Sequence, residues 1–275
     1  MATTCRTRIA PTPSGFLHVG NALNFLLIDE LARSMHGTVL LRIDDLDAAR
    51  TRPEYIDDIF DSLHGLGIPW HQGPRDPDDL ERHWRQSSRI ANAFSLMDEL
   101  RAIGVLYACT CSRAQISGCT CGTRSLPFDG PETAWRLRLP ADLTITVPGL
   151  FGHSTLVQLA QEIPDPVIRQ RNGQPAYQIA SLADDEFFGM NVIVRGTDLL
   201  PSTACQCHLA TLLQLDTFLQ VRFVHHPLLT DTTGRKLSKS AGDTALRTVL
   251  REKGAAERLR EQAIGVLAQL RDQGL

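Results

Sequence analysis

Two segments carry side chains suited to handling phosphate groups. The first, residues 11–21, reads Pro-Thr-Pro-Ser-Gly-Phe-Leu-His-Val-Gly-Asn and joins a predicted strand to a predicted helix. The start of a helix offers unpaired N–H groups and a positive dipole end, so this segment suits an anion. His18 can donate a hydrogen bond to a phosphate, and Gly15 and Gly20 let a ligand approach the backbone. Taken alone, the pattern is also typical of an ordinary turn with a surface histidine.

The second segment, residues 234–240, reads Gly-Arg-Lys-Leu-Ser-Lys-Ser. Lys236 and Lys239 stand three residues apart among glycine and hydroxyl residues, which predicts a cationic loop. Such a loop can stabilise the negative charge that develops on a pyrophosphate leaving group. Taken alone, it is also typical of a solvated basic loop.

Together, and in this order, the two segments resemble the signature elements of the class I aminoacyl-tRNA synthetases. His18-Val19-Gly20-Asn21 resembles their HIGH element, and residues 236–240 resemble their KMSKS element. The resemblance implies a Rossmann-like core that binds ATP through His18, Gly20, Asn21 and Lys239. It also implies catalytic roles for His18, Lys236 and Lys239, with Mg²⁺ accompanying ATP.

Four further motifs narrow the resemblance to the glutamyl branch of that class. They are Arg8-Ile9-Ala10-Pro11-Thr12-Pro13-Ser14-Gly15, Leu41-Arg42-Ile43-Asp44-Asp45-Leu46-Asp47, Gly173-Gln174-Pro175-Ala176-Tyr177-Gln178-Ile179-Ala180 and Val194-Arg195-Gly196-Thr197-Asp198-Leu199-Leu200. This resemblance implies that glutamate is the amino acid, with Arg8 contacting its side-chain carboxylate and Asp44 its ammonium group. The substrate pocket it implies consists of Arg8, Ala10, Thr12, Asp44, Tyr177 and Arg195.

The residue types agree with an acidic amino acid as substrate. Glutamate has two carboxylates and one ammonium group, so its site needs a guanidinium fork and an anion. Arg8 and Arg195 each end a predicted strand, where open α/β sheets bind ligands. Either arginine alone is also compatible with a surface ion pair. Asp44 departs from the family, which usually has glutamate there, so its carboxylate is set back by about one C–C bond. Either a water bridges that gap or the substrate sits differently.

A cysteine-rich stretch predicts a metal site. Two Cys-x-Cys pairs are separated by seven residues, and they comprise Cys109, Cys111, Cys119 and Cys121. Four thiolates at this density suit tetrahedral Zn²⁺, whereas the polar local sequence offers little core for four separate buried thiols. We predict a structural role, because a closed four-sulfur shell leaves no position for chemistry. The resembling family often uses a tyrosine ligand here, and no tyrosine lies between Cys111 and Cys121.

The elements that must position these residues form an α/β pattern. A strand at 6–10, a helix at 21–35 and a strand at 39–43 predict a βαβ unit and a parallel sheet. We expect further strands at 192–194 and 223–225 and one long helix at 78–103. The predicted division is 1–104 for the first half of a Rossmann-like core, 105–190 for an inserted zinc subdomain of acceptor-binding type, 191–243 for the second half with the lysine loop, and 244–275 for a helical C-terminal segment.

Composition limits the remaining possibilities. The 275 residues are 43% hydrophobic, which is enough for a sizeable core. A net charge of −3 argues against nucleic-acid binding by bulk charge, although a local basic surface stays open. The sequence has no apolar run long enough for a membrane span and no signal-peptide segment. We therefore expect a cytoplasmic monomer whose cysteines are thiols or metal ligands, with no membrane partner.

The chain stops soon after the lysine loop, whereas glutamyl-tRNA synthetases continue into a large part that reads the anticodon. A core of this size with a zinc insert resembles the glutamyl-queuosine tRNA(Asp) synthetase family. That resemblance implies ATP-dependent formation of glutamyl-adenylate and its transfer to the queuosine base of tRNA(Asp).

Two alternatives remain open. One is a related enzyme that activates glutamate or another amino acid for a small molecule, a carrier protein or a different RNA. The other is a non-catalytic RNA-binding protein built on a synthetase core.

Overall fold

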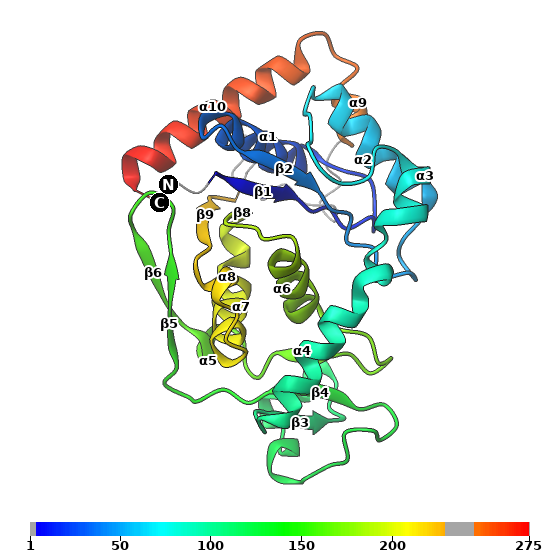
Figure 1. Cartoon of the computed structure of the whole chain (residues 1–275), viewed down its shortest axis with the longest axis vertical. Helices are drawn as coiled ribbons and strands as arrows, with labels where there is room; N and C mark the ends of the chain where they lie inside the picture. The colour runs from blue at the N-terminus through cyan, green and yellow to red at the C-terminus, as the bar shows by residue number, and fades with distance from the viewer. Residues whose placement is uncertain (1–3, 229–244, 275) are drawn as a thin grey trace.

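The computed structural model of the protein describes residues 4–228 and 245–274, and the structural statements below concern those residues. Lys236 and Lys239, and with them the predicted lysine loop, lie outside the described residues. Pairs of parallel strands lie between helices, and a three-stranded antiparallel sheet lies at the far end of the molecule (Figure 1). Within the described ranges, no helix combines the length and apolar composition that a membrane span requires.

The core contains two parallel strand pairs, β1 (Arg6–Ile9) with β2 (Thr38–Leu41) and β8 (Val192–Gly196) with β9 (Arg222–His226), and β1 lies beside β8. The two parallel pairs adjoin at Asn191. Its N–H donates to the Arg6 carbonyl at 3.1 Å, and its Oδ1 accepts from the Arg6 N–H at 2.7 Å. The predicted α/β fold with a parallel sheet is therefore confirmed.

The helix α1 (Val19–Ser34) connects β1 to β2 and is buried over most of its surface, because its apolar residues recur at helical spacing. The C-terminal helix α10 (Ala255–Gln273) packs along α1 (Figure 1). Arg260 of α10 contacts the buried Asp29 of α1 at 2.8 Å and also contacts Glu30. The C-terminal helix is thus fastened to the core by an ion-pair cluster as well as by apolar packing.

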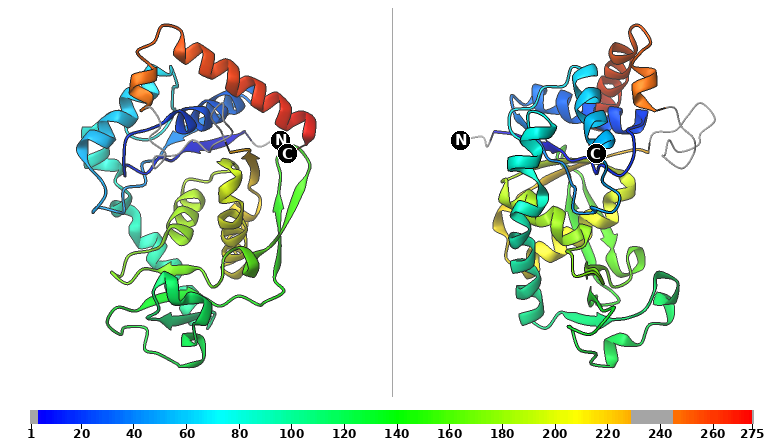
Figure 2. Two further views of the ribbon diagram at one scale, coloured as in Figure 1. Left: turned by 180° about the vertical axis from the view of Figure 1, so that it is seen from behind. Right: turned by 90° about the vertical axis from the view of Figure 1, so that its right-hand side faces the viewer.

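Helices cover the other face of the sheet as well (Figures 1 and 2). They are α6 (Tyr177–Phe187), which precedes β8, and the turn η5 (Thr197–Leu199), α7 (Leu200–Leu212) and α8 (Asp216–Leu219), which connect β8 to β9. A parallel sheet covered on both faces explains why its strands are almost wholly buried.

The structure differs from the single helix predicted at 78–103, because the chain breaks at Arg85. The N–H of Gln86 donates to Asp45 Oδ1 at 2.9 Å, whereas in a continuous helix it would bond to the carbonyl four residues earlier. The buried Gln86 amide donates to Asp184 Oδ2 at 2.8 Å. After α2 (Pro53–Gly65), the pieces are α3 (Pro77–Asp79), the π-helix η1 (Leu80–Trp84), the 3₁₀-helix η2 (Gln86–Arg89) and α4 (Ile90–Ala102).

Between α4 and α6 lie an antiparallel sheet and a long hairpin. The sheet contains β3 (Leu106–Cys109), β4 (Ala134–Leu137) and β7 (Val167–Arg169), with the short turns η3 (Arg113–Gly118) and η4 (Cys121–Thr123) after β3. The hairpin of β5 (Thr144–Pro148) and β6 (Ser154–Gln158), followed by α5 (Leu159–Glu162), runs back to the parallel sheet (Figure 1). At the hairpin tip, the His153 N–H donates to the Gly274 carbonyl at 3.1 Å. The predicted domain boundaries at 104, 190 and 243 stay predictions.

Candidate active site

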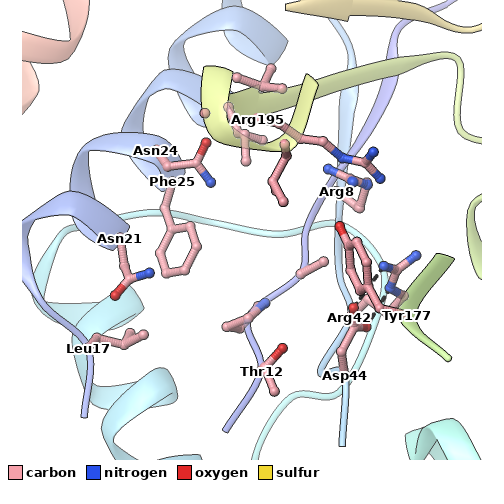
Figure 3. Close-up of a pocket in the computed structure, with 16 residues that line it drawn as sticks. Arg8, Thr12, Leu17, Asn21, Asn24, Phe25, Arg42, Asp44, Tyr177 and Arg195 are labelled. Atoms are coloured by element: carbon pink, nitrogen blue, oxygen red, sulfur yellow. Dashed lines mark hydrogen bonds and ion pairs between the residues drawn. The ribbon is translucent and has the colours of Figure 1, made fainter. Parts of the chain in front are cut away.

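A cavity of about 400 Å³ opens where β1, β2 and β8 end (Figure 3). This is the edge at which open α/β sheets bind ligands. All six residues predicted for the substrate pocket line it, and so does one residue predicted for ATP. The six are Arg8, Ala10, Thr12, Asp44, Tyr177 and Arg195, and the seventh is Asn21.

One carboxylate organises the arginines of this cavity. Asp185 of α6 is fully buried and contacts Arg8 Nε at 2.9 Å, Arg42 Nη1 at 2.7 Å and Arg195 Nη2 at 3.4 Å. Burial alone would raise the pKa of Asp185, but the three guanidinium groups together hold that pKa below its ordinary value. Asp185 therefore stays ionised, and its ion pairs connect α6 to β1, to the end of β2 and to β8.

Asp44 faces Arg42 inside the cavity. Its Oδ1 lies 2.7 Å from Arg42 Nε, and its Oδ2 lies 3.0 Å from Arg42 Nη2 (Figure 3). Burial raises the pKa of Asp44, and the Arg42 charge opposes that rise. Because Arg42 also contacts Asp185, its guanidinium is occupied on both sides. Asp44 thus lines the cavity as predicted, with both oxygens already engaged.

Arg8 and Arg195 differ in how far they are occupied. Arg195 Nη1 donates to Gln206 Oε1 at 2.6 Å and to Thr203 Oγ1 at 3.1 Å, both on α7. Arg8 is buried, and its Nε is held by Asp185. Within residues 4–228 and 245–274, the two terminal nitrogens of Arg8 donate to no other group. A planar pair of donors therefore lines the cavity, which is the geometry that a carboxylate accepts.

The buried charges around the cavity do not balance. A second carboxylate of α6, Asp184, pairs with Arg89 at 2.7 Å and lies 3.7 Å from Arg42. Among the described residues, the connected cluster holds four guanidinium groups and three carboxylates, which leaves one surplus positive charge. Protonation of Asp44 would only enlarge that surplus. A buried surplus charge is costly unless a ligand neutralises it.

The predicted phosphate-handling residues lie at the start of α1. The His18 N–H donates to Asn21 Oδ1 at 3.1 Å, and Gly20 lies in the first turn of the helix. Of these three residues, Asn21 lines the cavity, and the other two lie beside it in the chain. The loop is held by the Leu17 N–H, which donates to the buried Asp58 Oδ2 at 2.8 Å. The N-terminal end of α1, where the helix dipole is positive, thus begins at the rim of the cavity.

The described residues on either side of residues 229–244 contact α1 or the loop before it. On one side, His226 Nε2 lies 3.0 Å from Asn24 Oδ1 of α1. On the other, the Leu246 N–H donates to the Leu17 carbonyl at 2.8 Å. The two chain ends that flank residues 229–244 therefore lie against the helix that begins after His18.

The four predicted metal ligands come together at the far end of the molecule. Their sulfur atoms all lie within 4.8 Å of one another. Cys109 Sγ lies 3.7 Å from Cys119 Sγ, and Cys111 Sγ lies 3.6 Å from Cys121 Sγ. Four sulfurs at about 2.3 Å from a tetrahedral zinc would be about 3.8 Å apart, whereas a disulfide would need about 2.05 Å. The donor set and its spacing fit zinc.

Comparison with known proteins identifies the family. Residues 4–122 and 128–268 match the family described as tRNA synthetases class I (E and Q), catalytic domain. The chain belongs to this family. It is therefore a class I synthetase-type ligase, and ATP is the substrate that enzymes of this class share.

Relatives of this synthetase-family chain include a protein named glutamyl-Q tRNA(Asp) synthetase from Burkholderia orbicola (strain MC0-3). It is 37% identical over 256 residues, which are 88% of this chain and 82% of the relative. Glutamate–tRNA ligase 2 from Ruegeria sp. (strain TM1040) is 34% identical over 259 residues, which are 90% of this chain and 57% of the relative.

Solved structures support the fold. The glutamate–tRNA synthetase from Elizabethkingia anophelis superposes with a TM-score of 0.73 at 24% identity, covering 87% of this chain. This synthetase-family chain spans about half of that protein, 53% of its length. At this level of identity, the likeness is evidence for the shared catalytic fold alone.

Sequence reasoning missed Arg42 and Asp185 as members of the site. Arg42 lies inside a quoted motif, but the position of its side chain depends on how β2 ends. Asp184 and Asp185 directly follow the mainly apolar run of residues 179–183 in α6, and this position could have indicated that they are buried. Charged residues in such a stretch are buried only when they are paired.

His225 generates a prediction on acid stability. It lies behind Arg195, with its Nε2 3.0 Å from Thr203 Oγ1. Burial lowers the pKa of His225 to about 4, and Arg195 and His226 add to the shift. The unfolded chain therefore binds more protons than the folded chain between about pH 6.5 and pH 4, so stability falls as the pH falls through that range.

His225→Asn should remove about 2 kcal/mol of the stability difference between pH 7 and pH 5, measured by denaturant unfolding at both values. The matched control is His36→Asn, because His36 is exposed. If the wild-type protein and His225→Asn lost the same stability between pH 7 and pH 5, the lowered pKa of His225 would be contradicted.

Proposed function

We propose that this protein activates glutamate with ATP to form glutamyl-adenylate and then transfers the glutamyl group to the queuosine base of tRNA(Asp). The observation that carries the proposal is the cavity at the ends of β1 and β8. Among the described residues, the charges around it leave a positive surplus, and the terminal nitrogens of Arg8 donate to no other group. The start of α1, to which we assign phosphate binding, lies at the same cavity. An anionic amino acid and ATP can therefore meet there.

Glutamate matches the cavity in charge and in hydrogen-bonding groups. It carries a net charge of −1 at neutral pH, which neutralises the surplus of the buried cluster. Its side-chain carboxylate accepts from the terminal nitrogens of Arg8, and Arg195 completes the positive wall. Asp44 accepts from the ammonium group, because each carboxylate oxygen has a second lone pair after bonding to Arg42. Tyr177, which is 43% exposed, lies at the mouth of the pocket.

The chemistry needs no covalent enzyme intermediate. The α-carboxylate of glutamate attacks the α-phosphorus of ATP in line, an O–P bond forms, and the bond to pyrophosphate breaks. His18, Gly20 and the other N–H groups at the start of α1 hold phosphate oxygens. We assign stabilisation of the leaving group to Lys236 and Lys239, with Mg²⁺ accompanying ATP. A hydroxyl of the acceptor then attacks the adenylate carbonyl, and AMP leaves.

The acceptor is the finer part of the proposal. It rests on the relatives named glutamyl-Q tRNA(Asp) synthetase, of whose length the match covers 82%. A related enzyme with another acceptor is the first alternative. The second alternative is a non-catalytic RNA-binding protein, for which a surplus of buried positive charge beside a cavity has no evident use.

Pyrophosphate exchange separates these functions. With ATP and glutamate, the wild-type protein should exchange labelled pyrophosphate into ATP in the absence of tRNA, measured across all twenty amino acids. Charging should then occur on tRNA(Asp) that contains queuosine and not on tRNA(Asp) that lacks it. Exchange with a different amino acid alone would overturn the substrate, exchange without charging would overturn the acceptor, and no exchange at all would favour the non-catalytic alternative.

We propose that the four cysteines hold a structural zinc ion. Cys119→Ser should lower the zinc content of the purified protein from about one ion per chain to well below one, measured by elemental analysis, because three thiolates bind zinc more weakly than four. Cys207→Ser is the matched control, because this half-buried cysteine lies on α7, away from the cluster. Wild-type protein that neither contains zinc nor takes it up on reconstitution would contradict the proposal.

A further inference from the structure

We propose that Arg247 is a positioning residue for the ATP site and acts through Phe16 on the loop that carries His18. The activity that this role would affect rests on the proposed function, and the geometry rests on contacts between described residues. This role would belong to the C-terminal segment that the sequence predicts to be helical.

Three consecutive residues at the start of α9 (Leu246–Val249) contact three consecutive residues before α1. The Leu246 N–H donates to the Leu17 carbonyl at 2.8 Å. Ala245 forms an antiparallel bridge with His18. The Arg247 guanidinium carbon lies 3.8 Å from the centre of the Phe16 ring. The register is therefore fixed at every residue of the 16–18 loop.

The same loop is held from its other side by α2. The Tyr55 ring meets the Phe16 ring edge-on, with the ring centres 5.0 Å apart. The Leu17 N–H donates to Asp58, one turn further along α2. Phe16 thus contacts the Tyr55 ring and the Arg247 guanidinium, which come from segments far apart in the sequence.

The Arg247 contact is not explained by an ion pair. Among residues 4–228 and 245–274, no carboxylate lies within ion-pair distance of Arg247, which is exposed. Its described contact is the face of Phe16, where a cation is attracted by the ring quadrupole. Without that contact, the loop keeps its backbone bonds but loses a side-chain restraint. His18 and the first N–H groups of α1 would then be less well placed for phosphate.

The test is steady-state pyrophosphate exchange on Arg247→Gln, which keeps length and polarity and removes the charge. The KM for ATP should rise about two- to fivefold, the ratio expected when an exposed cation–π contact is lost. The KM for glutamate should stay unchanged, because Arg8 and Asp185 are not touched. Arg247→Lys should recover part of the loss. Arg251→Gln, the same change four residues on at an exposed position, should behave as wild type.

A double-mutant cycle with Phe16→Leu isolates the contact. If Arg247 acts through Phe16, the double variant should show about the same KM for ATP as the worse single variant, whereas independent effects would multiply. An unchanged KM for ATP in Arg247→Gln, or equal shifts for ATP and glutamate, would overturn the inference. If the wild-type protein shows no exchange, the proposed function fails. Calorimetric ATP binding to the same variants would then decide the inference on its own.

Discussion

The buried carboxylate of Asp185 is the contact on which the candidate site depends. Three guanidinium groups converge on it from β1, from the residue after β2, and from β8. Three arginines this close would repel one another, and burial would penalise each of them. Asp185 offsets both effects, so the strands can bring positive charge to one edge of the sheet. Removing it would leave several buried charges unpaired.

In that arrangement, two arginines are fully engaged by protein groups, and a third can still bind a ligand. Arg42 is occupied by Asp44 and Asp185, and Arg195 is braced by two side chains of α7. Among the described residues, Arg8 has a single anchor, Asp185 at its Nε, and its side chain lines the cavity. Rigid neighbours therefore hold a free donor pair in place before any ligand arrives, which lowers the ordering cost of binding. The site has the character of a preformed anion receptor beside a helix N-terminus.

Much of this could be predicted from the sequence, because the chemistry lies at the ends of regular elements. The βαβ pattern predicted the sheet edge at which the cavity lies. The arginines at the strand ends were predicted to line a substrate pocket and the cysteine pairs to form a metal site, and the structure brings each of these two groups together. The broken helix at Arg85 could not be predicted, because the competing hydrogen bonds come from Asp45 and Asp184, distant in the chain. The three ion pairs of Asp185 were missed for the same reason, because tertiary packing decides which arginines meet a carboxylate of α6.

In the described part of the chain, the charged cluster around the cavity has one positive charge in excess, and Arg8 keeps its terminal nitrogens for the ligand. Titration calorimetry of the wild-type protein with glutamate and with glutamine tests it most directly, because the two ligands have nearly the same shape and differ by one negative charge. Glutamate should bind roughly ten- to a hundredfold more tightly, since glutamine leaves a charged donor pair without a charged acceptor. Equal affinities, or tighter binding of glutamine, would contradict the account.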